Sequence, residues 1–318
     1  MNTDQRSEAT NETPRQLGAV ISMPQTTFMA GCLARTPFRA QVPAAAAAGF
    51  DSITIWPNIW RHARRRDALT LSDMRAMLDD AGLVLTDVDA CFDWVPAAAA
   101  EGSLRGPMRR RIPRAEFFEV CVALGGSTVV AVHLTDAGLE LGRDTEGFAA
   151  LCDEAAEHGL RVALEFFPFS NVPDLATAWS IVSQANRPNG GLVLDIWHYV
   201  RSGRDDDLLA RIPAERVYTV QLSDGPAKAP DDLAAEAMYG RLLPGKGEFG
   251  LASFVSRLDR MGVRAPCGPE LYSPSFDQRP VAAVMTDLYQ SVQDLHFGES
   301  GQAPWRTGSG SRPAGAVP

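Results

Sequence analysis

The chain has 318 residues, of which 45% are apolar, and it carries a formal net charge of −9 at pH 7. This length and composition suit one large globular domain, and an α/β barrel commonly has such a length. The acidic balance argues against a nucleic-acid-binding protein, which needs clustered Lys and Arg side chains.

The two ends of the chain differ in character from the part between them. Residues 1–16 are polar and acidic, and residues 299–318 have almost no apolar periodicity, so we expect two disordered tails around one domain at 17–298. The amino-terminal residues lack the pattern of a signal peptide, and no apolar run is long enough for a membrane span. The five cysteines form no Cys-x-x-Cys pair. Reduced thiols and a cytoplasmic location are therefore expected.

Apolar runs alternate with segments of helical character through this domain. We predict strands at residues 17–22, 52–56, 83–88, 128–134, 161–166, 191–196, 217–222 and 265–271. We predict helices at residues 37–48, 70–81, 114–124, 145–158, 174–186, 204–211, 251–261 and 281–295. Gly49, Gly82, Gly159 and Gly262 each follow a helical segment, as a left-handed cap requires. Alternating strands and helices in this number predict a single (β/α)₈ TIM barrel.

Polar side chains end four of the predicted strands in the second half of the chain. They are Glu165, Asp195, Gln221 and Glu270. Because the ends of successive parallel strands meet at one mouth of a barrel, these side chains should converge there. Any one of them alone is more simply a solvated residue or a helix cap. Together, three carboxylates and one amide make an oxygen-rich site for a hard divalent cation, and they point to an enzyme.

Two histidines and several aromatic residues lie near the same predicted mouth. His198 follows Asp195 by three residues, and either a substrate contact or ordinary packing fits it equally well. His133 ends the fourth predicted strand and is more simply a hydrogen-bonded core histidine than a site residue. Aromatic side chains follow the second and third strands and could form a pocket wall or pack between loops and helices. They are Trp56, Trp60, Phe92 and Trp94.

Five short motifs in the second half of the chain carry a resemblance to a known family. They are Leu164-Glu165-Phe166, Leu194-Asp195-Ile196-Trp197-His198, Val220-Gln221-Leu222-Ser223-Asp224, Arg241-Leu242-Leu243-Pro244-Gly245-Lys246-Gly247-Glu248 and Pro269-Glu270-Leu271. In this order they resemble the sugar isomerase/epimerase family with the xylose-isomerase-like barrel. The first half matches that family only in architecture.

The resemblance implies a ligand set for a divalent cation. The implied metal ligands are Glu165, Asp195, Gln221 and Glu270, with Glu165 and Glu270 also acting as the catalytic acid/base pair. Many members have histidine where this chain has Gln221. Since glutamine supplies a neutral oxygen, we expect Mn²⁺ or Mg²⁺ rather than Zn²⁺. Glutamine here is also what we expect in members resembling hydroxypyruvate isomerases and 3-dehydroshikimate dehydratases.

The resemblance also implies substrate contacts. His198 is expected to contact the substrate, and Arg241 is expected to reach a distal substrate oxygen, carboxylate or phosphate. An exposed loop cation is an equally good interpretation of Arg241. This residue lies in residues 225–250, a segment rich in Pro, Gly and charge, and long segments of this kind are usually functional or disordered.

The predicted chemistry is proton transfer next to a carbonyl group. A divalent cation would stabilise the enediolate that forms when an α-hydroxy carbonyl compound loses its carbon-bound proton. If Glu165 removes this proton from one face and Glu270 returns it from the other, the product is an epimer. Delivery to the neighbouring carbon gives the aldose or ketose isomer. The sequence therefore predicts a divalent-metal-dependent isomerase or epimerase of a small sugar.

Two other functions remain open from the sequence. Loss of a β-hydroxyl group from a similar enolate would make the protein a lyase resembling 3-dehydroshikimate dehydratase. A barrel that binds a sugar without turnover is the other. The tri-zinc endonucleases of the same fold need many histidines, whereas this chain has five. We expect a small polyhydroxylated substrate, neither nucleic acid nor membrane as a partner, and a homodimer in so far as such barrels often pair.

Overall fold

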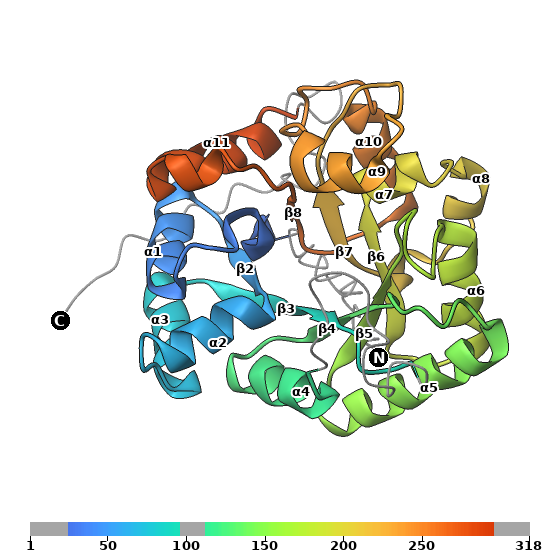
Figure 1. Ribbon diagram of the computed structural model, residues 1–318, viewed down its shortest axis with the longest axis horizontal. Coiled ribbons are helices and arrows are strands. Elements are labelled where there is room, and N and C mark those ends of the chain that lie inside the picture. Colours follow the sequence, from blue (N-terminus) through green and yellow to red (C-terminus); the bar gives the residue numbers. More distant parts are fainter. Residues whose placement is uncertain (1–24, 96–111, 296–318) are drawn as a thin grey trace, which may run out of the picture.

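Eight parallel strands form the centre of the molecule in the order β1 to β8 (Figure 1). The computed structural model describes residues 25–95 and 112–295. The strands are β1 Thr27–Phe28, β2 Ser52–Ile55, β3 Val84–Cys91, β4 Thr128–Val132, β5 Arg161–Glu165, β6 Gly190–Asp195, β7 Val217–Leu222 and β8 Cys267–Pro269. Thr26 and Cys267 form a parallel bridge, which joins the last strand to the beginning of the first. The predicted TIM barrel is therefore confirmed.

The helices surround this ring of strands (Figure 1). They are α1 Phe38–Ala48, α2 Pro57–Arg65, α3 Leu71–Ala81, α4 Arg114–Ala123, α5 Leu141–Glu157, α6 Leu175–Ala185, α7 Ile196–Arg201, α8 Asp206–Leu209, α9 Leu233–Ala235, α10 Leu251–Met261 and α11 Val281–Gln293. Short 3₁₀ turns lie at Ala30–Leu33, Ala214–Arg216 and Phe276–Gln278, and a π-helical turn lies at Glu236–Gly240. None of the described helices has both the length and the apolar character needed to cross a bilayer.

The predicted elements from residue 37 onward lie close to the observed ones, with a few differences. Helix α5 begins at Leu141, before the predicted start, because the Glu140 side chain accepts a hydrogen bond from Arg143 N and caps the helix. Helices α2 and α7 were not predicted, since each begins directly at the end of a strand. The predicted strand at 17–22 and the predicted tails at 1–16 and 299–318 lie outside the described residues, and β1 begins at Thr27.

Glycines allow two features that the barrel requires. Gly49, Gly82 and Gly262 cap α1, α3 and α10 with positive φ angles of 105°, 67° and 82°, as their positions predicted. Gly268 in β8 lies against the first strand so closely that a Cβ atom there would stand 1.7 Å from Thr27 O. Only glycine fits at this point of the seam, by which we mean the place where β8 meets β1.

Buried apolar side chains pack in two places. The larger cluster includes side chains of both helices and strands, and it fills the space around the sheet. Trp60, Phe117 and Phe254 are examples from the helices. A smaller cluster includes Val130 from β4 and Val193 from β6. All five cysteines are buried free thiols, in agreement with the expected absence of a disulfide framework.

Candidate active site

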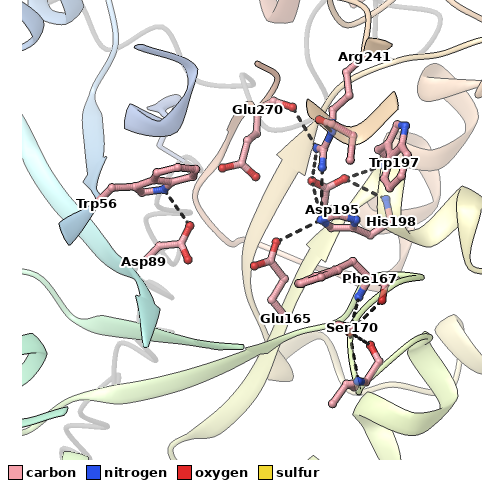
Figure 2. Close-up of polar contacts among 12 residues, drawn as sticks. Trp56, Asp89, Glu165, Phe167, Ser170, Asp195, Trp197, His198, Arg241 and Glu270 are labelled. Carbon is pink, nitrogen blue, oxygen red and sulfur yellow. Dashed lines mark hydrogen bonds and ion pairs between the residues drawn. The ribbon is translucent and has the colours of Figure 1, made fainter. Parts of the chain in front are cut away.

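Five polar side chains project from the carboxyl ends of strands into the mouth of the barrel. Asp89 lies near the end of β3, and Glu165, Asp195 and Gln221 lie at or near the ends of β5, β6 and β7, while Glu270 follows β8. Asp195 and Gln221 are paired in the β-ladder, so they lie at the same level. Each of the five residues is 8% exposed or less. Figure 2 shows the carboxylates of Asp89, Glu165 and Glu270 facing a common space.

Asp195 is held by hydrogen bonds to both carboxylate oxygens. Oδ1 accepts from Trp197 N at 2.7 Å and from His198 N at 3.2 Å, which makes Asp195 the N-cap of α7. Oδ2 accepts from Arg241 Nη1 at 2.6 Å. Burial opposes the charge on Asp195, but Arg241 and His198 hold its pKa below the ordinary value. Asp195 is therefore a fixed, ionised carboxylate.

His198 lies between this pair and Glu165. Its Nε2 stands 3.5 Å from Glu165 Oε1, 3.7 Å from Asp195 Oδ2 and 3.3 Å from Arg241 Nη2 (Figure 2). Burial lowers the pKa of His198 to about 3, against the opposing effect of Asp195. The imidazole is therefore neutral, and its Nε2 can accept a hydrogen bond from the guanidinium. The ring packs on Phe167, with 5.2 Å between the ring centroids.

Arg241 enters the site from the long segment after β7. The side chain is 5% exposed, its Nε donates to Ala237 O at 3.1 Å, and its Nη1 also donates to Glu270 O at 3.3 Å. The guanidinium lies over the Trp197 ring, 4.9 Å from its centroid. The exposed-cation interpretation of Arg241 is therefore wrong, because this side chain is buried within the carboxylate cluster.

The carboxyl groups opposite Asp195 resist ionisation. Burial, followed by the charge of Asp195, raises the pKa of Glu165 to about 8. Burial, together with the charges of Glu165, Asp89 and Asp195, raises the pKa of Glu270 well above the ordinary value. Like charges in one buried space cannot all persist without a counterion. A divalent cation would supply that positive charge.

His133 has a different environment. Its side chain is fully buried, and Nε2 lies 3.2 Å from Asp144 Oδ2 at the beginning of α5. The ring also meets Trp94 edge to face, with 5.6 Å between the ring centroids. These contacts are those of the hydrogen-bonded core histidine that the sequence favoured, so the structure offers no support for a substrate contact by His133.

Two further residues near the mouth, Asp89 and Tyr272, were not identified from the sequence. The Asp89 carboxylate accepts a hydrogen bond at Oδ2 from Trp56 Nε1 at 3.0 Å. Tyr272 packs against Trp56, with 5.5 Å between the ring centroids. Alternation along β3 could have indicated Asp89, since residues two apart in a strand share a face and Asp87 lies in the same strand. Among the four aromatic residues proposed as a pocket wall, Trp56 lies at the site, whereas Trp60 and Trp94 are packed in the core.

The segment after β7 is folded by its own contacts. Asp224 Oδ1 accepts from Gly225 N and Phe249 N, at 2.9 and 3.0 Å, which ties the two ends of the segment together. An open hollow of about 710 Å³ is lined by this segment between Pro226 and Gly240, and none of the five polar mouth residues lines it. The carboxylate cluster is the candidate active site because it gathers buried carboxyl groups with raised pKa values at the ends of the strands.

A family model described as a xylose isomerase-like TIM barrel matches residues 42–290. The chain belongs to the xylose isomerase-like TIM-barrel family. This finding confirms the resemblance drawn from the second-half motifs, and it extends the relationship into the first half of the chain.

The named relatives of this chain include a dehydratase and an isomerase. The chain is 30% identical over 256 residues to 3-dehydroshikimate dehydratase of Pseudomonas aeruginosa, a match covering 79% of this chain and 39% of that protein. It is 30% identical over 165 residues to inosose isomerase of Bacillus subtilis, covering 50% and 58%. The chain thus spans about two-fifths of the dehydratase's length. A solved structure of the IOLI protein with a bound zinc atom has a TM-score of 0.71 at 19% identity, covering 86% of this chain and 99% of that one.

Within this xylose isomerase-like barrel, the residues present fit a divalent cation. Ligand atoms of Glu165, Asp195 and His198 lie within 4.8 Å of one another. Gln221 Oε1 is buried and has no hydrogen-bond partner among the described residues, which is the state expected of an oxygen reserved for a ligand. The geometric group includes His198, which the sequence assigned to substrate, and does not include Glu270. A possible buried metal site therefore stands, with carboxylate, amide and imidazole donors available.

Proposed function

We propose that this protein is a divalent-metal-dependent isomerase or epimerase of a small sugar or other α-hydroxy carbonyl compound. One observation carries the proposal: two buried carboxyl groups with raised pKa values, Glu165 and Glu270, face the same space as the fixed carboxylate of Asp195. Groups of this kind exchange protons near neutral pH, which is what a proton-transfer enzyme needs.

The proposed cation site is made by Glu165, Asp195, Gln221 and Glu270, with His198 beside it. When bound, a cation such as Mn²⁺ or Mg²⁺ would act as a Lewis acid toward substrate oxygens. Asp195 is already oriented by the backbone of α7 and by Arg241, so it need not reorganise. The unpartnered Gln221 Oε1 offers a neutral oxygen, which supports a hard cation over Zn²⁺.

The proton transfer falls to Glu165 and Glu270. One of them takes the proton from the carbon next to the carbonyl, and the electron pair of that C–H bond moves toward the carbonyl carbon as an enediolate forms. The other returns a proton to the opposite face, which gives the epimer, or one group returns it to the neighbouring carbon, which gives the isomer. Neutral His198, fixed by Arg241 and Phe167, is positioned to orient a substrate hydroxyl.

A dehydratase is the second candidate, and the 30% identity to a 3-dehydroshikimate dehydratase favours it. In that reaction one carboxylate would remove the carbon-bound proton, and the other carboxyl group would protonate the β-hydroxyl group, which would leave as water. The product carries a new conjugated double bond, whereas an isomer or epimer does not.

Deuterium uptake separates these reactions. The protein would be incubated with Mg²⁺ or Mn²⁺ in D₂O and presented with a ketohexose, an inosose or 3-dehydroshikimate. Mass spectrometry should show one deuterium in the recovered sugar or inosose, and a new ultraviolet absorption with 3-dehydroshikimate would select the dehydratase instead. Glu165→Gln and Glu270→Gln should each lower the exchange rate by at least 10²-fold, since a general base contributes about that much or more.

A matched control and a metal measurement complete the test. Glu119→Gln makes the same chemical change at an exposed position on α4 and should leave exchange unchanged. Elemental analysis should find one divalent cation per chain, retained in Glu119→Gln and lost in Asp195→Asn. Wild-type protein that holds no cation after reconstitution and exchanges no proton would leave a non-catalytic sugar-binding barrel as the better account.

A further inference from the structure

Asp89 is a buried carboxylate at the mouth with one oxygen bound and the other open. Its side chain comes from β3, on the opposite side of the common space from Asp195 and His198 (Figure 2). The residue is 5% exposed, and Oδ2 accepts from Trp56 Nε1 at 3.0 Å. Oδ1 is buried and has no hydrogen-bond partner among the described residues. Buried polar atoms are nearly always paired, so an open carboxylate oxygen here calls for a ligand.

The open oxygen is held in place by a rigid support. Trp56 lies at the end of β2 and is the residue before α2. Its ring is packed against the backbone of Gly31, where a Cβ atom would stand 2.5 Å from Trp56 Cζ2. Tyr272 also packs against the ring, with 5.5 Å between the ring centroids. Because the indole cannot move freely, its N–H fixes the Asp89 carboxylate and leaves Oδ1 directed away from the indole.

The charges around this oxygen select what can approach it. The carboxyl groups of Asp89, Glu165, Asp195 and Glu270 share the mouth, and they influence one another electrostatically. Arg241, whose charge acts on Glu165, Asp195 and Glu270, is already bound to Asp195. A substrate carboxylate placed near Asp89 would therefore be repelled by these acidic groups. A substrate hydroxyl group can instead donate a hydrogen bond to a carboxylate or accept one from a carboxyl group.

The geometry points to Asp89 as a substrate-binding residue that takes a hydroxyl group and makes the site prefer uncharged polyhydroxylated ligands over those that bear a carboxylate. This inference rests on the proposed function and names the substrate class of the same site. Trp56 is a positioning residue, since it acts through Asp89.

Two ligands that are matched in structure but differ in charge test the preference directly. 3-Dehydroshikimate and its methyl ester share the ring, the ketone and the hydroxyl groups, and they differ in one negative charge. Their dissociation constants would be measured by calorimetry on the full chain reconstituted with Mg²⁺. Wild-type protein should bind the ester at least 10-fold more tightly than the acid. Asp89→Asn should reduce this ratio at least fivefold, because it removes the repulsion and keeps the side-chain shape.

Two further variants keep the outcome clear. Trp56→Phe keeps Asp89 but removes the N–H donor, and it should also reduce the ratio, which protects the test if Asp89→Asn does not fold. Asp79→Asn changes an exposed aspartate on α3 and should leave the ratio unchanged. A ratio unchanged in both mouth variants, tighter binding of the acid by wild type, or no binding of the ester would each overturn the inference.

The failure of this inference differs from failure of the proposed function. If the proposed function is wrong, wild-type protein takes up no cation and catalyses no deuterium exchange. If only the role of Asp89 is wrong, the cation is bound and exchange occurs, yet the affinity ratio does not respond to Asp89→Asn. Elemental analysis of each variant separates the two cases, because Asp89→Asn is expected to retain the wild-type metal content.

Discussion

Asp87 lies inside the barrel and should make the protein less stable as the pH rises. The residue is 1% exposed, and its Oδ2 accepts from Thr86 Oγ1 at 3.0 Å and from Thr219 Oγ1, on β7, at 3.3 Å. Burial raises the pKa of Asp87 from 3.8 to about 6, in spite of these two hydrogen bonds. Replacing it by asparagine keeps the shape and an acceptor oxygen but removes the charge.

The sign and size of the effect follow from linkage. Because the pKa of Asp87 is higher in the folded than in the unfolded chain, the stability that this group contributes is fully present below pH 3.8 and is lost as the pH rises through 6. A rise from 3.8 to about 6 corresponds to roughly 3 kcal/mol in the free energy of unfolding once the group is ionised in both states. Asp87→Asn should therefore be more stable than wild type by about 3 kcal/mol at pH 8 and by less than about 1 kcal/mol at pH 4.

Urea denaturation followed by circular dichroism at pH 4, 6 and 8 measures this difference. Asp144→Asn is the contrasting variant: burial raises the pKa of Asp144, but hydrogen bonds from His133 and Arg143 outweigh it and lower the pKa to about 2. Its loss should therefore destabilise the protein at neutral pH, with the penalty fading as the pH falls through 2. An Asp87→Asn variant whose stability gain stays the same from pH 4 to pH 8 would refute the raised pKa of Asp87.

Three other outcomes are expected. A saturating divalent cation, at about 100 times its dissociation constant, should stabilise wild type by about 2.7 kcal/mol but not Glu165→Gln, as measured by thermal melting with and without chelator. Arg241→Met should cost about 3–5 kcal/mol in urea denaturation, because Asp195 is left buried and unpaired; an unchanged midpoint would contradict this. Gly268→Ala should give little folded protein by circular dichroism, since its Cβ atom would stand 1.7 Å from Thr27 O; a wild-type melting curve would show that the seam can open.

The second half of the barrel could be predicted because its strands give a simple signal. β5, β6 and β7 are largely apolar runs buried on both faces, and each has its chemically active residue at or near its end. Once the strand ends were known, convergence of Glu165, Asp195 and Gln221 followed from the geometry of a parallel barrel. These three residues could be assigned to the site from their places on the strands alone, without knowledge of any contact.

The remaining site residues depend on contacts that the local sequence does not encode. Asp87 and Asp89 interrupt the apolar pattern of β3, so the predicted strand ended at residue 88 and Asp89 was not recognised. Arg241 binds Asp195 across 46 residues of sequence, through a π-helical turn that no periodicity indicated. The predicted strand at 17–22 had the expected apolar character, whereas the observed β1 has only two residues, Thr27 and Phe28, too few for a periodic signal.

The acceptor oxygens at the mouth differ in whether groups of the protein already occupy them. Both oxygens of Asp195 are occupied, by backbone N–H groups of α7 and by Arg241, so this carboxylate is fixed before any ligand arrives. Gln221 Oε1 and Asp89 Oδ1 are buried and open. An unpaired buried acceptor costs about 1–3 kcal/mol, so a bound group that pairs with these two atoms would restore that free energy. Gln221 Oε1, on β7, is one of the proposed cation ligands, whereas Asp89, on β3, lies across the mouth from Asp195 (Figure 2). A substrate that spans the mouth would meet the cation at one end and Asp89 at the other.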